Sequence, residues 1–276
     1  MHLLIWIILF TLVGGILSVI AASLFLLVPD RHYSTLLPHG ISFALGALLS
    51  VAFLDLLPHA VENAGMDGVE GLFGTVLLGI LLFFLLEKLL LWRHCHANDC
   101  EAHNDGQEHY HQPAGTLIVV GDGIHNFVDG VLISAAFLTD LHLGVITSLA
   151  IAAHEIPQEV GDFAILLQSG YSKPKAIFYN IMSSLGTVVG GVMAYFALAS
   201  LHEALPYFLA LAASSFIYIA VADLIPTLHK KTHAGAMVQQ LALIFAGVVL
   251  IAWVHHFADR YNPAQDKPLP NNGLQY

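Results

Sequence analysis

The chain is poor in charge, in basic residues and in cysteine, and each shortage excludes a class of protein. Only 11% of its 276 residues are charged and 57% are hydrophobic, whereas soluble domains carry roughly 25% charged residues. A soluble globular fold is therefore excluded. Nine Lys and Arg residues and a net charge of −11 exclude a nucleic-acid-binding protein, which needs a basic face. The two cysteines, Cys95 and Cys100, lie in one polar segment and exclude a disulfide framework.

Polar breaks divide the rest of the chain into eight long apolar stretches. Each is close to the roughly 20 residues that a helix needs to cross about 30 Å of hydrocarbon. The stretches cover residues 3–28, 36–60, 71–92, 115–138, 143–168, 175–200, 205–228 and 237–258. The first is too long for the apolar core of a signal peptide, so we interpret it as a retained membrane span. The sequence predicts an all-α integral membrane protein with eight transmembrane helices in a single domain, residues 1–276.

The basic residues predict how these helices are oriented in the lipid bilayer. Seven of the nine lie in alternate loops between the stretches, and such loops face the cytoplasm. These seven are Arg31, Lys88, Arg93, Lys173, Lys175, Lys230 and Lys231. An even number of crossings then places the N- and C-termini, including the polar tail 259–276, on the outer side. We expect a multi-pass protein of the plasma (inner) membrane.

A weak internal repeat relates the second stretch to the seventh. VAFLDLLP matches IAVADLIP when Asp55 is aligned with Asp223. Because the second stretch runs outward and the seventh inward, the copies have opposite topology, as in transporters built from inverted repeats. We expect a 3+2+3 arrangement in which helices 1–3 and 6–8 are the repeats and helices 4 and 5 are central. Asp55 and His59 would lie along a pathway near the outer face, and Asp223 and His229 near the inner face.

The fourth and fifth stretches carry polar residues at helical spacing, so each presents one polar face. On the fourth these residues are Asp122, His125, Asn126 and Asp129, and on the fifth they are His154, Glu155, Gln158, Glu159 and Asp162. Five acids in two membrane spans cost on the order of 10–15 kcal/mol, and neither stretch contains Lys or Arg. A divalent cation, a water-filled cavity or protonation must offset this cost. The alternative is a set of hydrogen bonds that only holds helices together.

The mixture of donor groups on these faces indicates which ions they suit. Imidazole, carboxylate and amide oxygen together favour Zn²⁺, Fe²⁺ or Mn²⁺ over Mg²⁺ or K⁺. A second candidate for metal binding is the histidine-rich segment 94–112 between the third and fourth stretches. Its candidate ligands are His94, Cys95, His96, Cys100, His103, His109 and His111. Their spacing matches no closed structural zinc site, so we interpret the segment as a cytoplasmic loop that captures metal weakly. A solvated linker is the alternative.

At these residues the sequence resembles the ZIP family of divalent-metal transporters. HNFVDG on the fourth stretch and HEIPQEVGD on the fifth match the paired metal-site motifs of that family. The second motif is close to the HExPHExGD signature of one ZIP subfamily, with Gln158 where the signature has His. The eight-helix outline, the outer termini and the His-rich loop match as well, so the resemblance covers nearly the whole chain.

The resemblance implies a binuclear metal centre between the fourth and fifth helices. It assigns His125, Asp129, His154 and Gln158 to one ion. It assigns Asn126, Asp129 and Glu155 to the second, with Asp129 bridging the two. Glu159 is a further candidate ligand, and Asp122 and Asp162 are candidates for the pathway.

The sequence therefore predicts a ZIP-like permease and not an enzyme. Its expected cargo is Zn²⁺, with Fe²⁺, Mn²⁺ and Cd²⁺ as further candidates, moved into the cytoplasm through a centre at the membrane midplane. The expected partners are divalent metal ions and the lipid bilayer but not nucleic acid, and a homodimer is left open. The alternative is an intramembrane zinc metalloprotease, because HEIPQ differs by one residue from the H-E-x-x-H pattern. The missing final His argues against it.

Overall fold

The computed structural model describes residues 2–25, 30–96, 112–198, 200–229 and 234–260. Within these ranges every regular element is helical, in agreement with the predicted all-α fold. The elements are α1 (His2–Leu12), η1 (Val13–Leu17), α2 (Ser18–Phe25), α3 (Asp30–Ser50), η2 (Val51–Leu56), α4 (Leu57–His96), α5 (Gln112–Thr139), α6 (Leu141–Gln168), α7 (Lys173–Leu198), η3 (His202–Ala204), α8 (Leu205–Ile219), η4 (Ala220–Leu224), α9 (Ile225–His229) and α10 (Ala234–Arg260). η1, η2 and η4 are π-helical turns, and η3 is a 3-10 turn.

Five segments of the described chain are long and apolar enough to cross a membrane. They are His2–Leu24, Leu37–Leu89, Lys173–Leu198, Leu205–His229 and Gly235–His256. α5 and α6, whose polar faces lower their hydropathy, are not among these five. Large apolar side chains such as Leu78, Phe196 and Phe245 are exposed on the bundle surface, where a lipid environment would cover them. The helices are thus those of a multi-pass membrane protein.

The predicted break between the stretches 36–60 and 71–92 contains a sharp turn. The segment α4 comprises two helical parts that meet at Gly65, where φ is +68° and ψ is 174° and the chain changes direction. Only glycine adopts this conformation without strain. The polar residues Glu62, Asp67 and Glu70 around the turn lie on helix. Polar composition marked the turn, but helix extends up to it on both sides because Glu is a good helix former.

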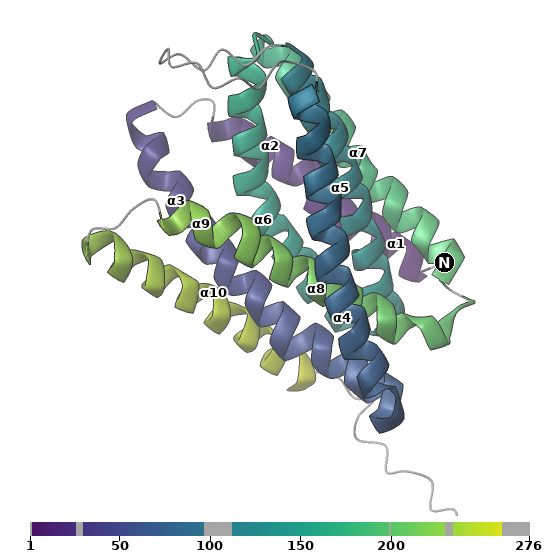
Figure 1. Cartoon of the computed structure of the whole chain (residues 1–276). Coiled ribbons are helices and arrows are strands. Elements are labelled where there is room, and N and C mark those ends of the chain that lie inside the picture. The colour runs from purple at the N-terminus through teal and green to yellow at the C-terminus, as the bar shows by residue number, and fades with distance from the viewer. Residues whose placement is uncertain (1, 26–29, 97–111, 199, 230–233, 261–276) are drawn as a thin grey trace, which may run out of the picture.

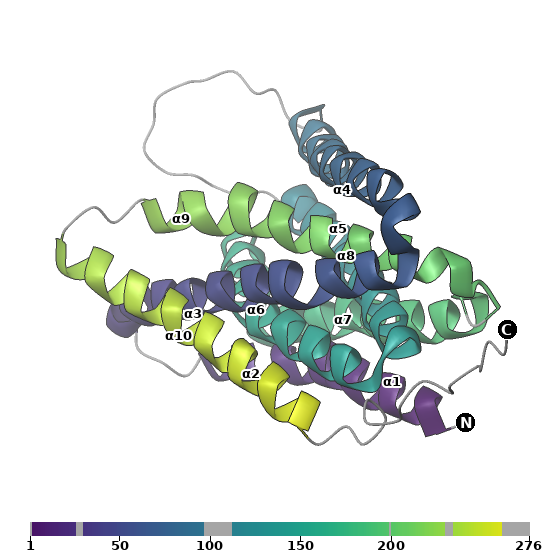
Figure 2. The ribbon, with the colours of Figure 1, turned by 90° about the horizontal axis from the view of Figure 1, so that it is seen from below.

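α5 is the helix around which the polar faces are assembled, and it packs on both α6 and α7. A methyl group on Gly130 would lie 2.0 Å from the carbonyl oxygen of Thr187, and one on Gly190 would lie 2.0 Å from that of Phe127. These two glycines let the backbones of α5 and α7 touch, as small residues do between membrane helices. Figure 1 shows α5, α6 and α7 running alongside one another, and Figure 2 shows α10 lying along α3.

The close approach of α5 and α7 makes Gly190 intolerant of a side chain. We expect Gly190→Val to destabilise the protein by about 1–3 kcal/mol, the usual cost of overpacking, and to lower the Tm of the purified protein in detergent. Gly74→Val is the matched control, because nothing lies within 4 Å of a methyl group at that position. Equal Tm values for the two variants would contradict the packing described here.

Candidate metal centre

The connection between α5 and α6 brings their polar faces together. α5 ends at Thr139 and α6 begins at Leu141, so Asp140 alone makes the turn. Its Oδ1 accepts hydrogen bonds from the backbone N–H groups of His142 at 2.8 Å and Leu143 at 3.1 Å, and this caps the N-terminus of α6. Helices joined by so short a connection are antiparallel neighbours, and their polar faces meet along their length.

Two imidazoles and two carboxylates converge between these helices. The Nε2 atoms of His125 and His154 are 3.4 Å apart. Glu155 Oε1 lies 3.5 Å from His125 Nε2 and 3.3 Å from His154 Nε2, and Asp129 Oδ2 lies 3.8 Å and 3.4 Å from the same two atoms. Two ligands bound tetrahedrally at about 2.0–2.1 Å are themselves roughly 3.3 Å apart. The four groups are therefore spaced as ligands of one small ion.

A second group of acids adjoins the first. Asp122, Glu155 and Glu159 each offer an oxygen within 4.8 Å of the others, and all three residues are buried. The Ser184 hydroxyl donates a hydrogen bond to Glu159 Oε1 at 2.9 Å. Among the described residues, Asp122 Oδ2, Glu159 Oε2 and both Glu155 oxygens have no hydrogen-bond partner. Leaving such buried acceptors unsatisfied is costly, and a second cation is a group that would satisfy them.

Two of the ligands that the resemblance implies make hydrogen bonds away from the first group. Gln158 Nε2 donates to Asp122 Oδ1 at 3.2 Å. Asn126 donates from Nδ2 to the same oxygen at 3.0 Å and accepts at Oδ1 from the Thr187 hydroxyl at 2.7 Å. Glu155 is the residue common to both groups, whereas the resemblance gives the bridging role to Asp129. Sequence analysis did not identify Thr187, because a lone hydroxyl on an apolar helix is a weak signal.

A cavity of about 500 Å³ extends from the centre toward one end of the bundle. The predicted pathway residues Asp122, Asp162 and Asp223 line it, and His229, at the exposed end of α9, does not. The lining also includes Glu87, His125, His154, Gln158, Tyr218 and Thr227. Among the described residues that line this cavity, none belongs to η2 or α10. The centre is thus reached from the end of the bundle at which α4 and α9 finish.

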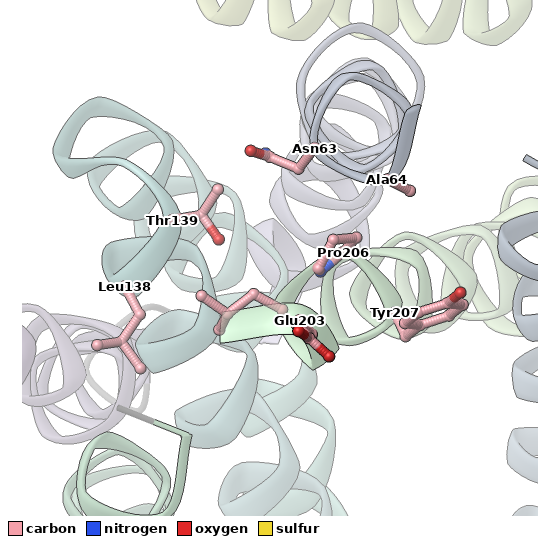
Figure 3. Close-up of a pocket in the computed structure, with 8 residues that line it drawn as sticks. Asn63, Ala64, Leu138, Thr139, Glu203, Pro206 and Tyr207 are labelled. Carbon is pink, nitrogen blue, oxygen red and sulfur yellow. The ribbon is translucent and has the colours of Figure 1, made fainter. Parts of the chain in front are cut away.

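The other two predicted pathway residues lie toward the opposite end. Asp55 is 1% exposed, and its Oδ1 lies 2.6 Å from Nδ1 of His255 on α10. His59 Nδ1 lies 2.8 Å from the backbone oxygen of Asp55. A separate cavity of about 430 Å³ lies at this end, and Figure 3 shows Asn63, Thr139, Glu203 and Tyr207 around it. Asn63 Nδ2 donates to the backbone oxygen of His59 at 2.7 Å.

The predicted metal-capture loop falls almost wholly outside the described residues. The backbone of His94, Cys95 and His96 forms the last turn of α4. Cys100, His103, His109 and His111 lie outside the described residues, as does the tail beyond Arg260.

Comparison with known proteins assigns the chain to a family. A sequence model described as ZIP zinc transporter matches residues 1–113 and 93–255. The chain belongs to the ZIP family of zinc transporters. Its relatives include the zinc transporter ZIP13 of Pongo abelii, which is 33% identical over 79% of this chain and 67% of its own length. The zinc transporter YKE4 of Saccharomyces cerevisiae is 30% identical over 77% of this chain and 69% of its own length.

Other ZIP relatives match a shorter part of their own length. The zinc transporter ZIP10 of Danio rerio is 35% identical over 52% of this chain, and this match spans 18% of the relative. Membership of a transporter family confirms the expectation that the chain is not an enzyme. The metalloprotease alternative receives no support from these comparisons.

If Asp129 is a ligand of the first ion, an isosteric amide should weaken binding there. At a Zn²⁺ concentration one hundred times the Kd, binding stabilises a protein by about 2.7 kcal/mol. We expect Asp129→Asn to lose most of the Zn²⁺-induced rise in Tm. Asp140→Asn is the matched control, since Asn caps a helix as well as Asp does, and it should keep the full rise. An undiminished rise in Asp129→Asn would exclude Asp129 as a ligand.

Proposed function

We propose that this chain moves Zn²⁺ across a membrane and into the cytoplasm through the centre between α5 and α6. The observation that supports this most is the convergence of His125, Asp129, His154 and Glu155, whose ligand atoms all lie within 4.8 Å of one another. Imidazole and carboxylate are ligands that suit Zn²⁺. Relatives named as zinc transporters support the choice of cargo, and Fe²⁺, Mn²⁺ and Cd²⁺ are further candidates for the same donors.

The proposed direction of transport follows from the cavity and the basic residues. Glu87 and Thr227 line the cavity near the ends of α4 and α9. Arg93 lies near the C-terminal end of α4, and Lys230 and Lys231 follow α9 in the sequence. Basic residues at the ends of membrane helices mark the cytoplasmic side. The centre then faces the cytoplasm, and both termini lie outside. The proposal includes eight membrane crossings in a 3+2+3 arrangement and a location in the plasma (inner) membrane.

A binuclear centre is part of the proposal. The first ion would bind His125, His154, Asp129 and Glu155. The second would bind Asp122, Glu155 and Glu159, all of which offer oxygen. Because oxygen-only sites hold transition metals less tightly than sites with imidazole, the second ion would be the more weakly bound. Asp122 and Asp162 would then guide ions from the centre into the cavity, and Asp223 would line their exit.

Uptake into proteoliposomes tests the proposed function. With a Zn²⁺-sensitive dye trapped inside, the purified wild-type protein should accumulate Zn²⁺ down its gradient, and His154→Ala should reduce the initial rate by at least tenfold, since it removes one of two imidazole ligands. His142→Ala is the matched control, because His142 lies at the start of α6, where its Nδ1 is 3.7 Å from Asp140 Oδ1, and it belongs to neither group of candidate ligands. Equal rates for the two variants would contradict a transport site at His154.

Gln158 offers a test of metal preference. It lies one turn after His154, so Gln158→His would place a third imidazole beside the first ion. Sites rich in nitrogen favour Zn²⁺ over Mn²⁺, and we expect competition assays to show at least a threefold shift toward Zn²⁺. The maximal rate should stay equal or fall, because a tightly held ion leaves slowly. Gln158→Ala, which removes the amide without adding a ligand, should show no shift toward Zn²⁺. The same shift in both variants would contradict imidazole ligation.

A further inference from the structure

The structure extends the internal repeat far beyond the eight matched residues. Asp55 and Asp223 differ in number by 168, and each lies in a π-helical turn, η2 and η4. The helix contacts repeat as well, because α3 packs on α10 and α4 packs on α8. If α3 corresponds to α8 and α4 corresponds to α10, then the contact between α3 and α10 is repeated as the contact between α8 and α4. The turn type and the packing therefore support one register for the repeat.

Small residues at the two helix contacts are related by the same offset in residue number as the two aspartates. Gly79 and Gly247 differ by 168, as do Gly46 and Ser214. A methyl group on Gly79 would lie 2.0 Å from Ser214 Oγ, and one on Gly46 would lie 2.0 Å from the backbone oxygen of Ile244. Both contacts thus depend on small residues at corresponding positions. The register therefore holds at these two helix contacts as well as at the aspartates.

The same register pairs Glu87 on α4 with His255 on α10. These are the residues that accompany the two aspartates. His255 Nδ1 contacts the Asp55 carboxylate at 2.6 Å. Glu87 lines the cavity together with Asp223, and the Tyr218 hydroxyl donates a hydrogen bond to it. Each copy therefore places a titratable side chain of its third helix at the end where the π-helical turn of the other copy carries an aspartate.

The two ends differ in the chemistry of that side chain. At 2.6 Å two lone pairs would repel, so the His255 nitrogen must carry a proton toward the Asp55 carboxylate. This contact is attractive, and Asp55 is buried. Glu87 is an acid like Asp223 and offers it no such partner. Asp223 is exposed, and the cavity lies beside it.

An apolar layer separates the buried aspartate from the metal centre. Val51 and Ala52 of η2 belong to the same buried cluster as Ile151 and Phe216, and all four are 0% exposed. The Phe216 ring lies edge-on to the His154 ring, with their centroids 6.3 Å apart. The centre is therefore covered by apolar side chains toward the η2 end, whereas the Glu87 end is open to the cavity.

We propose that His255 is a gating residue: its contact with Asp55 holds η2 against α10 and closes the outer end of the pathway. Its counterpart Glu87 leaves the inner end open because it repels Asp223. The asymmetry between the two copies thus sets which end is closed in this conformation. The proposal rests on the proposed transport function. It identifies His255 as a positioning residue that acts on the pathway through Asp55, without contacting the ion at the centre.

Cysteine accessibility tests the outer gate independently of transport. On a background with Cys95→Ser and Cys100→Ser, Ala52→Cys reports access to η2, and its rate of reaction with a maleimide is measured on the purified full chain in detergent. We expect His255→Ala and His255→Glu each to raise that rate at least tenfold. His256→Ala is the matched control, because His256 is the exposed neighbour on α10, and it should leave the rate within twofold.

The reciprocal substitution tests the inner end. Thr227→Cys reports on the cavity and should react rapidly in the starting protein. Glu87→His, which gives Asp223 the partner that Asp55 has, should slow that reaction at least fivefold, whereas Lys88→His, on the exposed adjacent residue, should not. This arm does not depend on the folding of any His255 variant.

Three results would overturn the gate. One is an unchanged rate at residue 52 in both His255 variants. Another is a faster rate accompanied by loss of the Zn²⁺-induced rise in Tm, which would mean general loosening of the fold. The third is an unchanged rate at residue 227 in Glu87→His. None of these results concerns Zn²⁺ uptake by the wild-type protein or the dependence of uptake on His154. The gate can therefore be wrong while the proposed function is right, and the experiments distinguish the two cases.

Discussion

The structure depends on burying four acids between two helices that contain no Lys or Arg. Asp122, Asp129, Glu155 and Glu159 are buried, and Asp162 lies beside them on α6. No arrangement of apolar helices makes this favourable by itself, because buried charge is costly unless it is compensated. Two histidines at about 3.3–3.8 Å from two of the acids supply part of the compensation. A divalent cation would supply the rest, so the buried acids that are costly to the fold are also what makes this region a candidate metal site.

The helices and the polar faces were predictable from the sequence, for physical reasons. Apolar runs near the length of a membrane span stand out in a chain with so few charges. The i, i+4 spacing of His125 with Asp129 and of Glu155 with Glu159 places each pair on one helix face. The short turn at Asp140 then determines that the two faces meet. These features depend on local periodicity and chain connectivity, which a sequence displays directly.

Other features were not predictable, because they depend on contacts between segments distant in sequence. The hydrogen bond between Thr187 and Asn126 joins α7 to α5, and nothing near Thr187 in the sequence marks it. The polar residues from Glu62 to Glu70 mark a break in the apolar run, but they do not show that helix continues up to Gly65 on both sides. The contact between Asp55 and His255 was missed because the repeat was read only around the aspartates. Extending the same register along the chain would have brought Glu87 and His255 to attention.

The hydroxyl groups of α7 have a consequence for how this kind of protein can change its cargo. Ser184 holds one oxygen of Glu159, and Thr187 holds the amide oxygen of Asn126, yet neither hydroxyl belongs to the groups of candidate ligands on α5 and α6. Substitutions at these two positions would reorient the oxygen donors while every ligand stays in place. Over evolutionary time, preference among metals could therefore drift through a helix that itself offers no imidazole or carboxylate to the ion.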